Sequence, residues 1–414
     1  MLLVKGLGAE LEQLNKLWSY MWLRRTGSKD LFSLSSLVLA STLLIGFLCL
    51  AATSLPAYLD EKVYIDCGVS YVAKLTPPLS CNFEHPPLAK YIIGFAWLYG
   101  FARSLYVVLY AASSLLVFLV VYRLTSSYAA SLLSATLLAL DTVYYNTHRY
   151  LLLDPPALFF ALLALYAYLS GRGWLSAVFA GLAVACKFSA LPVALALFTL
   201  TMRSGGFRRA LFYAGLSVMA YLLTYAGDLQ LGWGAIIAHH YEMYEYMAWR
   251  HGFSTPIAVN GFLKLIARVE LWRLPGEYTV LFNASSGSVV SYVFTPIGRS
   301  FLVVYTGAGS VLWHLLLPTL LYATYKALTG PVERGLKTLV LLSWASLVNI
   351  VAGPLDWYYI NALPYLYATT SILLAGASSR KHGSVMKAVL VATQVAHFSL
   401  VVLGVVPYRL TFTH

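Results

Sequence analysis

The stretch RSLYVVLYAASSLLVFLVVY, residues 103–122, decides the fold class of this chain. Its one charged side chain stands at the first position, and the rest is apolar, aromatic or small. A helix needs about 20 mainly apolar residues to cross a hydrocarbon core about 30 Å thick. The stretch therefore predicts a transmembrane helix.

The same pattern recurs along the whole chain. Of its 414 residues, 60% are hydrophobic and only 11% are charged, whereas a soluble domain carries about 25% charged residues. The mean hydropathy of +0.73 agrees. We expect an all-α polytopic membrane protein with about 11 transmembrane helices, at 32–55, 103–122, 128–142, 153–171, 174–186, 188–202, 210–227, 301–328, 336–353, 358–378 and 387–406.

Charge along the chain predicts the orientation. With the N-terminus in the cytoplasm, the short inner loops are rich in Lys and Arg, as the positive-inside rule requires, and the C-terminus lies outside. Of the 16 acidic residues, 12 then fall outside: Asp60, Glu61, Asp66, Glu84, Asp141, Asp154, Asp228, Glu242, Glu245, Glu270, Glu277 and Asp356. The net charge of +12 is thus explained by topology, and no nucleic-acid-reading motif accompanies it.

This orientation divides the chain into four parts. Residues 1–31 form a cytoplasmic segment, 32–227 the first seven spans with the outer loop 56–102, 228–300 a second long outer loop, and 301–414 the last four spans. Leu88 to Ala102 is apolar but too short to span, and His239 to Arg250 is rich in Tyr and Trp. Both are expected to be helices at the membrane interface, and neither loop is long enough for a separate β domain.

An acidic pair, Asp60-Glu61, follows the first span. Apolar surroundings raise the pKa of a carboxylate and make it a stronger base, so the pair suits proton abstraction. The alternative is that these acids are ordinary interfacial residues.

A second motif in the same loop is Glu84-His85-Pro86-Pro87-Leu88-Ala89-Lys90. The two prolines restrict the backbone before them and can start the helix that follows. Lys90 then has two readings, contact with a phosphate or extension along the apolar surface to water. The alternative for the motif is a helix start with an acidic cap.

Two basic side chains stand near later span ends. Arg149 lies at an outer mouth, against the positive-inside trend, so it needs a partner: a lipid phosphate, or a salt bridge to Asp154 or Asp141. Lys187 lies between two apolar spans and also needs an anionic partner, either a phosphate or a protein acid.

Cysteine and histidine leave two further questions open. Cys67 and Cys81 lie in the first outer loop and suit a disulfide if that loop faces an oxidising compartment. Glu84, His85 and His239 offer ligand atoms for a divalent metal. His239 and His240 are adjacent and point apart on a helix, so a metal-free site is favoured.

These motifs, in this order, resemble the protein O-mannosyltransferases. The resemblance rests on Asp60-Glu61, on Glu84 to Lys90, on Asn146-Thr-His-Arg149-Tyr-Leu-Leu-Leu-Asp154 and on Gly181 to Lys187. It implies the GT-C glycosyltransferase superfold. The family's motif has Gly where Ala89 stands. The loop 228–300 is too short for the β-trefoil (MIR) domain of eukaryotic members, so the chain resembles the prokaryotic or archaeal form.

The resemblance also implies roles for the site residues. Asp60 would deprotonate the acceptor hydroxyl, and Glu61 would hold the acceptor or tune that base. Arg149 would bind the donor phosphate, with Asp154 orienting it. The supporting set would be His85, Lys90 and Lys187 at the donor, with Glu84 and Asp141 near them.

The function implied is transfer of mannose, or a related hexose, with inversion, from a dolichyl (polyprenyl) phosphate to protein Ser or Thr. The cofactor expectation is the lipid donor, with no tightly bound group. The enzyme would be a multi-pass protein of the cell membrane acting on its extracytoplasmic face, without nucleic-acid partners. Two alternatives are the same donor chemistry with a lipid or glycan acceptor, as in aminoarabinose transfer to lipid A, and a transporter or lipid flippase. A transporter predicts ionisable residues at the midplane and often an inverted repeat. Here the unusual charges gather at one face.

Overall fold

The structure is a computed structural model of the chain. It describes residues 28–51, 59–251, 279–283, 289–291, 301–305, 312–330, 334–349, 360–376, 381–402 and 411–413. Residues 1–27 of the cytoplasmic segment, 252–278 of the second outer loop and 350–359, with Asp356, lie outside these ranges.

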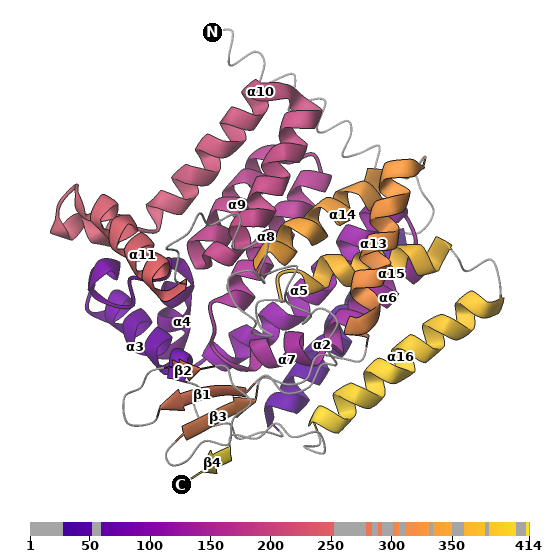
Figure 1. The fold of residues 1–414 in the computed structure, drawn as a ribbon, viewed down its shortest axis with the longest axis horizontal. Coiled ribbons are helices and arrows are strands. Elements are labelled where there is room, and N and C mark those ends of the chain that lie inside the picture. The colour runs from indigo at the N-terminus through magenta and orange to yellow at the C-terminus, as the bar shows by residue number, and fades with distance from the viewer. Residues whose placement is uncertain are drawn as a thin grey trace.

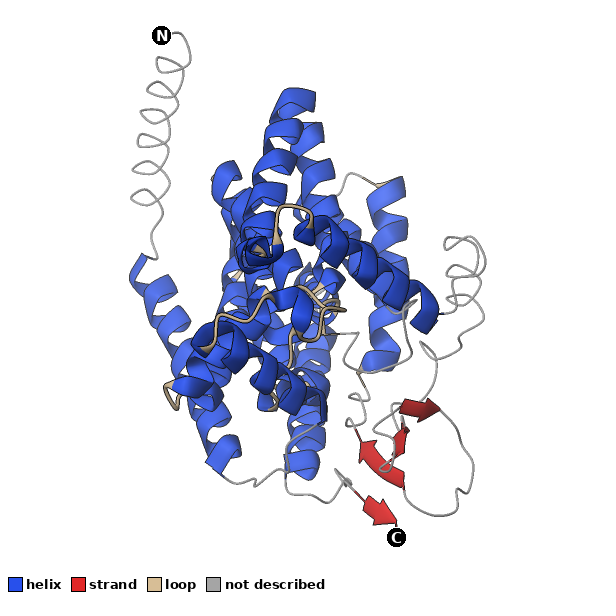
Figure 2. Ribbon diagram, turned by 90° about the vertical axis from the view of Figure 1, so that its left-hand side faces the viewer, coloured by secondary structure: helices blue, strands red, loops and turns tan. Residues whose placement is uncertain are grey.

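Helices make up most of the described chain (Figures 1 and 2). The N-terminal half contains α2 (Ser28–Ala51), α3 (Leu59–Ala73), the 3₁₀ turn η1 (Pro78–Ser80), α4 (Leu88–Leu98), α5 (Ala102–Thr125), α6 (Tyr128–Ala139), α7 (Thr142–Arg149), α8 (Asp154–Leu169) and α9 (Gly173–Cys186). The chain continues with η2 (Phe188–Ala190), α10 (Leu191–Leu223), η3 (Ala226–Leu231), α11 (Ala235–His251), α13 (Trp313–Thr329), α14 (Arg334–Leu347), α15 (Leu363–Gly376) and α16 (Lys381–Val402).

The core of the bundle is built around α5. This helix packs against α2, α6, α7 and α8, while α8 packs on α9 and α9 on α10. The buried faces are lined by Leu, Val, Ala and Tyr, with Tyr106, Val121, Leu138 and Leu165 fully buried. Between the large residues, small ones such as Ala and Ser allow helices to approach closely, as is usual in membrane bundles.

Several predicted spans correspond to single helices. The spans predicted at 103–122, 153–171 and 174–186 appear as α5, α8 and α9. Among the described residues, two runs are long and apolar enough to cross a membrane on their own, Ala102–Thr125 and Phe188–Leu223. The pair α7 and α8, bent by 117°, would make a third if it is one broken span. The number of eleven spans and the predicted orientation stay predictions.

Helix α10 contains a reversal. Gly206 has φ 75° and ψ 176°, which is not helical, and a glycine adopts a positive φ without steric cost. Two arms meet at the top of the view in Figure 1. They match the spans predicted separately at 188–202 and 210–227, and the sequence RSGGFRR at 203–209 forms the bend between them.

Four short strands correct the prediction of a purely helical chain. β1 (Thr279–Asn283), β2 (Val289–Ser291), β3 (Phe301–Tyr305) and β4 (Thr411–Thr413) form an antiparallel sheet in the order β2-β1-β3-β4. Figure 2 shows it beside one end of the helical bundle. The span predicted at 301–328 was therefore wrong in its first part: the aromatic and β-branched run Phe301–Tyr305 favours a strand, and the helix begins only at Trp313.

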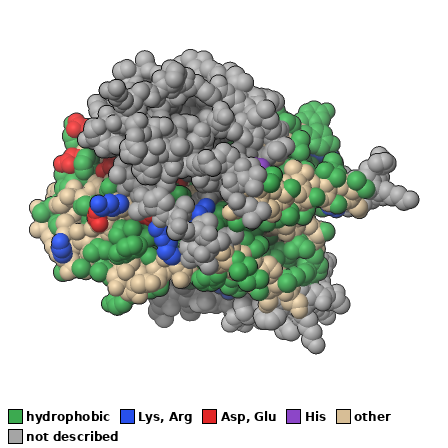
Figure 3. All heavy atoms as spheres, turned by 90° about the horizontal axis from the view of Figure 1, so that it is seen from below, with side chains coloured by type: hydrophobic (Ala, Val, Ile, Leu, Met, Phe, Trp, Pro, Cys, Tyr) green, Lys and Arg blue, Asp and Glu red, His purple; other side chains and the backbone are tan. Residues whose placement is uncertain are grey.

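Part of the molecular surface is apolar, as a membrane protein requires. In the view from below, hydrophobic side chains cover much of the described surface, and the charged ones lie mostly in one part of it (Figure 3). Exposed apolar residues include Leu37, Leu44, Leu211 and Leu223. These positions on α2 and α10 suit contact with lipid.

Two glycines hold α3 directly against α4. A Cβ built on Gly68 would lie 2.1 Å from the carbonyl oxygen of Lys90 and 2.8 Å from the nitrogen of Gly94. A Cβ on Gly94 would lie 2.0 Å from the carbonyl carbon of Gly68. The helices thus cross backbone to backbone, which ties the acidic pair at the start of α3 to the proline-containing segment before α4.

Candidate active site

The acidic pair lies in the first turn of α3, a segment that was predicted to be loop. Carboxylates are favoured there because they face the positive end of the helix dipole. Asp60 is partly exposed. Glu61 is fully buried, and its Oε1 accepts a hydrogen bond of 2.9 Å from the backbone N–H of Leu151. The pair therefore consists of one carboxylate held inside and one that solvent can reach.

Arg103 joins the acidic pair to the second polar segment. Its guanidinium forms an ion pair with Glu61 and donates a hydrogen bond of 2.6 Å to the carbonyl oxygen of Arg149. Glu61 itself contacts Leu151, two residues beyond Arg149. Residues from α3, α5 and the link after α7 therefore meet at one place.

The chain bends sharply where Arg149 stands. Helices α7 and α8 meet at 117°, and the link between them is held from α5 by the Tyr106 hydroxyl, which donates to the carbonyl oxygen of Leu152 over 2.5 Å. Arg149 is 9% exposed, and its guanidinium carbon lies 5.3 Å from the ring centroid of Tyr145, within cation–π range. The Arg149 side chain is thus held near the mouth of the bend.

Lys187 pairs with Asp154. Its ammonium lies 2.9 Å from Oδ1 and 2.7 Å from Oδ2 of the carboxylate, and the two side chains are 12% and 2% exposed. The sequence allowed either a phosphate or a protein acid as the partner of Lys187, and the structure shows a contact with a protein acid, Asp154. This bridge joins the start of α8 to the end of α9, and the expected role of Asp154 in orienting Arg149 stays a prediction.

Asp141 has a structural position. It caps α7 by accepting a hydrogen bond from the backbone N–H of Tyr144, and it accepts bonds of 2.7 Å from the indole of Trp313 and the hydroxyl of Tyr367. This fully buried carboxylate therefore ties α7 to α13 and α15. Its expected place near the donor site stays a prediction.

Lys90 turns toward the interior of the protein. It is fully buried, and its ammonium donates to the carbonyl oxygen of Asn82, to that of His85 at 2.9 Å and to Oδ1 of Asn82 at 3.3 Å. Burial lowers the pKa of Lys90 to about 7, against the attraction of Glu84 and Asp228. These contacts hold the turn that carries His85, and the predicted contact of Lys90 with the donor stays a prediction.

The segment before α4 is held by several other groups. A disulfide joins Cys67 on α3 to Cys81, and the Tyr71 hydroxyl donates to the carbonyl oxygens of Cys81 and of Pro78, the latter at 3.2 Å. Burial raises the pKa of Tyr71 well above its ordinary value, so the phenol remains a donor. Glu84 accepts a 2.6 Å bond from the amide of Asn82.

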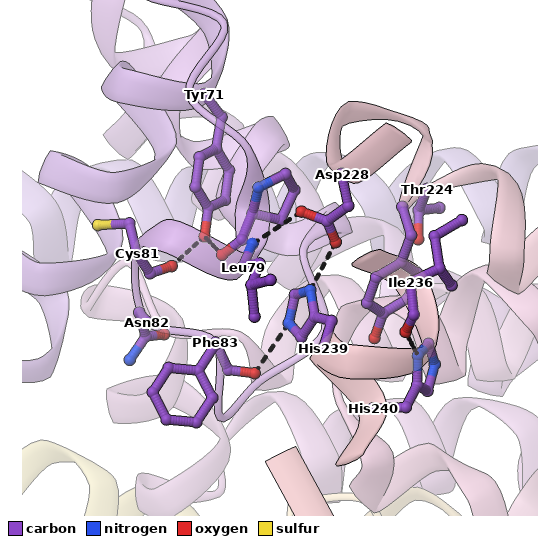
Figure 4. A network of polar contacts seen from close by, with 12 residues as sticks. Tyr71, Leu79, Cys81, Asn82, Phe83, Thr224, Asp228, Ile236, His239 and His240 are labelled. Atoms are coloured by element: carbon purple, nitrogen blue, oxygen red, sulfur yellow. Dashed lines mark hydrogen bonds and ion pairs between the residues drawn. The ribbon is translucent and has the colours of Figure 1, made fainter. Parts of the chain in front are cut away.

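A buried carboxylate–imidazole pair from the predicted second outer loop reaches the same segment (Figure 4). Oδ2 of Asp228 lies 2.6 Å from Nδ1 of His239, and both side chains are fully buried. Oδ1 of Asp228 accepts from the backbone N–H of Leu79 at 2.8 Å, and Nε2 of His239 lies 3.0 Å from the carbonyl oxygen of Phe83.

The proposed metal ligands are engaged in these contacts. His239 binds Asp228 and Phe83, Glu84 binds Asn82, and the His85 ring stacks edge-on against Tyr64 with centroids 6.1 Å apart. Over the described residues, no group of three or more His, Cys, Asp or Glu side chains is placed to hold a metal ion.

Sequence reasoning missed Arg103 and the Asp228–His239 pair. In the predicted orientation Arg103 stands at an outer span end, against the positive-inside trend, so the signal that singled out Arg149 applied to it as well. The Asp228–His239 pair has no local signal, because its partners lie 149 and 156 residues away in the sequence.

Comparison with known proteins gives a family match for the central segment of the chain. Residues 98–243 match the family model described as dolichyl-phosphate-mannose-protein mannosyltransferase. The match includes Arg103, Arg149, Asp154, Lys187 and Asp228, whereas Asp60, Glu61 and the segment Glu84–Lys90 precede it. A search of curated proteins gives no significant match.

Three solved structures are similar at low sequence identity. The S. cerevisiae protein O-mannosyltransferase Pmt1–Pmt2 complex bound to its sugar donor has 16% identity and a TM-score of 0.38, over 55% of this chain and 36% of that one. ArnT from Cupriavidus metallidurans has 16% identity and a TM-score of 0.49, over 84% of this chain and 61% of that one. The Archaeoglobus fulgidus oligosaccharyltransferase has 14% identity and a TM-score of 0.47, over 91% and 54%.

This chain thus spans less than two thirds of each of these three structures. The family match is independent of them, and it agrees with the resemblance carried by Arg149 to Asp154 and by Gly181 to Lys187. Over residues 98–243, the chain is therefore similar to the dolichyl-phosphate-mannose-protein mannosyltransferase family.

Proposed function

We propose that this chain is an inverting glycosyltransferase of the membrane. It takes mannose, or a related hexose, from a dolichyl or other polyprenyl phosphate and transfers it to Ser or Thr hydroxyls of proteins on the extracytoplasmic face. One observation carries the proposal: Arg103 and Leu151 bind Glu61 and so fix the acidic pair beside the link that follows Arg149. Arg103 and this link lie inside the segment that matches the family model.

The two acids have different roles in this mechanism. Glu61 is buried and already bound by a guanidinium and a backbone N–H, whereas Asp60 is partly exposed. Asp60 therefore accepts the proton of the acceptor hydroxyl, and Glu61 holds the start of α3 in place. General-base assistance of this kind contributes a factor of about 10² to 10⁴ in rate.

The bond changes balance in one displacement. The acceptor oxygen attacks C1 of the sugar, its proton passes to Asp60, and the bond from C1 to the phosphate oxygen breaks. The bonding electrons leave with the polyprenyl phosphate as an anion, which the Arg149 guanidinium stabilises. Because the base and the leaving group lie on opposite faces of the sugar, the configuration at C1 inverts.

The remaining predicted site residues support this arrangement. Lys187 and Asp154 hold the ends of α9 and α8 together and so shape the donor side of the site. Lys90 and Glu84 shape the turn before α4, and His85 lies in that turn with its ring against Tyr64. Asp141 fixes α7, the helix that ends at Arg149.

A transfer assay on the purified full chain tests the proposal, with labelled mannosyl polyprenyl phosphate as donor and a Ser/Thr peptide as acceptor. Asp60→Asn is expected to lower turnover by about 10³-fold while donor binding is retained. Asp66→Asn is the matched control, since Asp66 lies on the same helix and is exposed. Near-normal turnover of Asp60→Asn would remove Asp60 as the base.

The same assay separates donor from acceptor. Arg149→Ala is expected to weaken donor binding more than peptide binding, and an unchanged donor affinity would leave Arg149 a structural role only. Transfer to a lipid or a glycan, with none to peptide, would establish the alternative acceptor class.

A further inference from the structure

The segment from Pro78 to His85 has little secondary structure, and almost every contact that fixes it comes from a buried side chain. Tyr71 and Lys90, from α3 and α4, bind its carbonyl oxygens. These two helices belong to the same outer loop as the segment itself. Asp228 and His239 come instead from η3 and α11, in the second outer loop.

The Asp228–His239 contacts are placed on both sides of Cys81. Asp228 binds the backbone N–H of Leu79, two residues before that cysteine. His239 lies against the carbonyl oxygen of Phe83, two residues after it. Figure 4 shows the carboxylate and the ring side by side between these two points. The pair therefore holds the backbone that leads into Glu84 and His85.

The two ring nitrogens of His239 face different oxygen atoms, and this determines where protons must lie for both contacts to be hydrogen bonds. Nδ1 of His239 faces a carboxylate oxygen and Nε2 faces a carbonyl oxygen, and a carbonyl oxygen only accepts. Both contacts are hydrogen bonds when one proton lies between Nδ1 and Oδ2 and a second lies on Nε2. In such a buried, fully connected network, the loss of one member leaves the others unsatisfied.

Among the described residues, the ring nitrogens of the neighbouring His240 bind groups outside the segment Pro78–His85. Its Nε2 lies 2.8 Å from the Tyr221 hydroxyl and its Nδ1 2.6 Å from the carbonyl oxygen of Ile236. Those contacts stay within α10 and α11, so two adjacent histidines on one helix differ in whether they reach the first outer loop.

We propose that Asp228 and His239 are positioning residues, through which the second outer loop fixes the segment Leu79–His85 beside the acidic pair. The pair acts on the backbone of that segment and touches no reacting atom. The effect on catalysis rests on the proposed function, whereas the effect on the segment does not.

The first test measures how easily the segment opens and needs no activity measurement. A water-soluble phosphine is added to the folded full chain in detergent, and reduction of the Cys67–Cys81 disulfide is followed by mass spectrometry of alkylated peptides. Asp228→Ala and His239→Ala are expected to speed the reduction about tenfold, because the backbone on both sides of Cys81 then opens more often. His240→Ala, the matched control, is expected to react at the wild-type rate.

A conservative variant separates a hydrogen-bonding role from a need for charge. In Asp228→Asn, the amide oxygen still accepts from Leu79, the amide N–H donates to Nδ1, and Nε2–H of a neutral ring donates to Phe83. This variant is expected to be reduced at the wild-type rate. Wild-type rates in both alanine variants would overturn the proposal, as would a fast rate in His240→Ala equal to that in His239→Ala.

The second test is kcat for glycosyl transfer, expressed per donor-binding protein so that unfolded material does not count. The two alanine variants are expected to lose about tenfold in kcat, with Asp228→Asn and His240→Ala unchanged. Faster reduction with unchanged kcat would overturn the catalytic part of the proposal. If the wild-type chain transfers no sugar, the proposed function fails, and the reduction rates still decide whether the pair holds the segment.

Discussion

The two side chains of the Arg103–Glu61 ion pair differ in their burial. Glu61 is fully buried, and the Arg103 side chain is 33% exposed. Arg103→Ala removes the guanidinium that is paired with the buried Glu61 carboxylate, so we expect it to lower the free energy of unfolding by about 2 kcal/mol. Glu61→Gln retains the acceptor for Leu151 and leaves a guanidinium that water can reach, so it should cost less.

The double variant makes the comparison decisive. Arg103→Ala combined with Glu61→Gln removes both charges of this ion pair, so its thermal stability in detergent should exceed that of Arg103→Ala alone. Equal or lower stability of the double variant would show that the loss comes from elsewhere, for example from the bond between Arg103 and the Arg149 carbonyl oxygen.

Lys90 gives a prediction about pH. Burial lowers its pKa from 10.5 to about 7 in the folded chain. Between these values the unfolded chain binds more protons than the folded one, so this residue makes stability rise with pH, by at most about 1.4 kcal/mol per pH unit. Below pH 7 both states are protonated and the contribution to the slope vanishes. Melting temperatures from pH 6 to 9 should therefore rise more steeply for the wild type than for Lys90→Met, and parallel curves would contradict the prediction.

At the scale of single residues, the sequence indicated which residues belong to the candidate site better than it indicated which groups they contact. Asp60, Glu61 and Arg149 stand out because charge at a membrane edge is costly, and the structure brings their segments together through Arg103. The inward direction of Lys90 could not be predicted, because it depends on where the carbonyl oxygens of Asn82 and His85 come to lie.

At the scale of elements, the crossing of α3 and α4 depends on glycine. Gly68→Ala would place a Cβ 2.1 Å from the carbonyl oxygen of Lys90, so the helices must separate, at a cost of about 2 kcal/mol or more. Gly215 on α10 is the matched control, since a Cβ there meets nothing within 4 Å and Ala favours a helix over Gly by about 1 kcal/mol.

Thermal unfolding and the transfer assay measure the outcome. Gly68→Ala should lose stability and turnover, and Gly215→Ala should keep both or gain stability. If Gly68→Ala is as stable as Gly215→Ala, the two helices do not need their close approach.

The predicted elements succeeded where apolar length alone decides. α5, α8 and α9 end within a few residues of the predicted spans. α3 and α7 were missed because both are short and polar, and their helical form depends on packing, including the α3–α4 crossing and the bond from Tyr144 to Asp141. β3 was read as part of a span, since five apolar residues do not reveal whether their partner is lipid or another strand.

At the scale of the whole molecule, the charge pattern and the fold together predict on which side of the membrane the candidate site lies. The bend of α10 at residues 203–209 carries three arginines, and η3, after its second arm, leads into the loop that binds the candidate site. If the positive-inside rule places the bend in the cytoplasm, the second arm must carry the chain across the membrane to the side of Asp60 and Arg149.

Cysteine labelling tests this orientation in cells. Phe207, at the bend, is 70% exposed and Trp233, after η3, is 87% exposed, so a cysteine at either site should be reachable from its own side. Cys186 is buried and Cys67 is bonded to Cys81, and Cys49 is replaced by Ser in the background to remove the remaining thiol. A membrane-impermeant maleimide added to intact cells should label Trp233→Cys, and should label Phe207→Cys only after the membrane is opened. The reverse pattern would put the acidic pair in the cytoplasm, and labelling of both sites in intact cells would mean that the second arm of α10 does not cross the membrane.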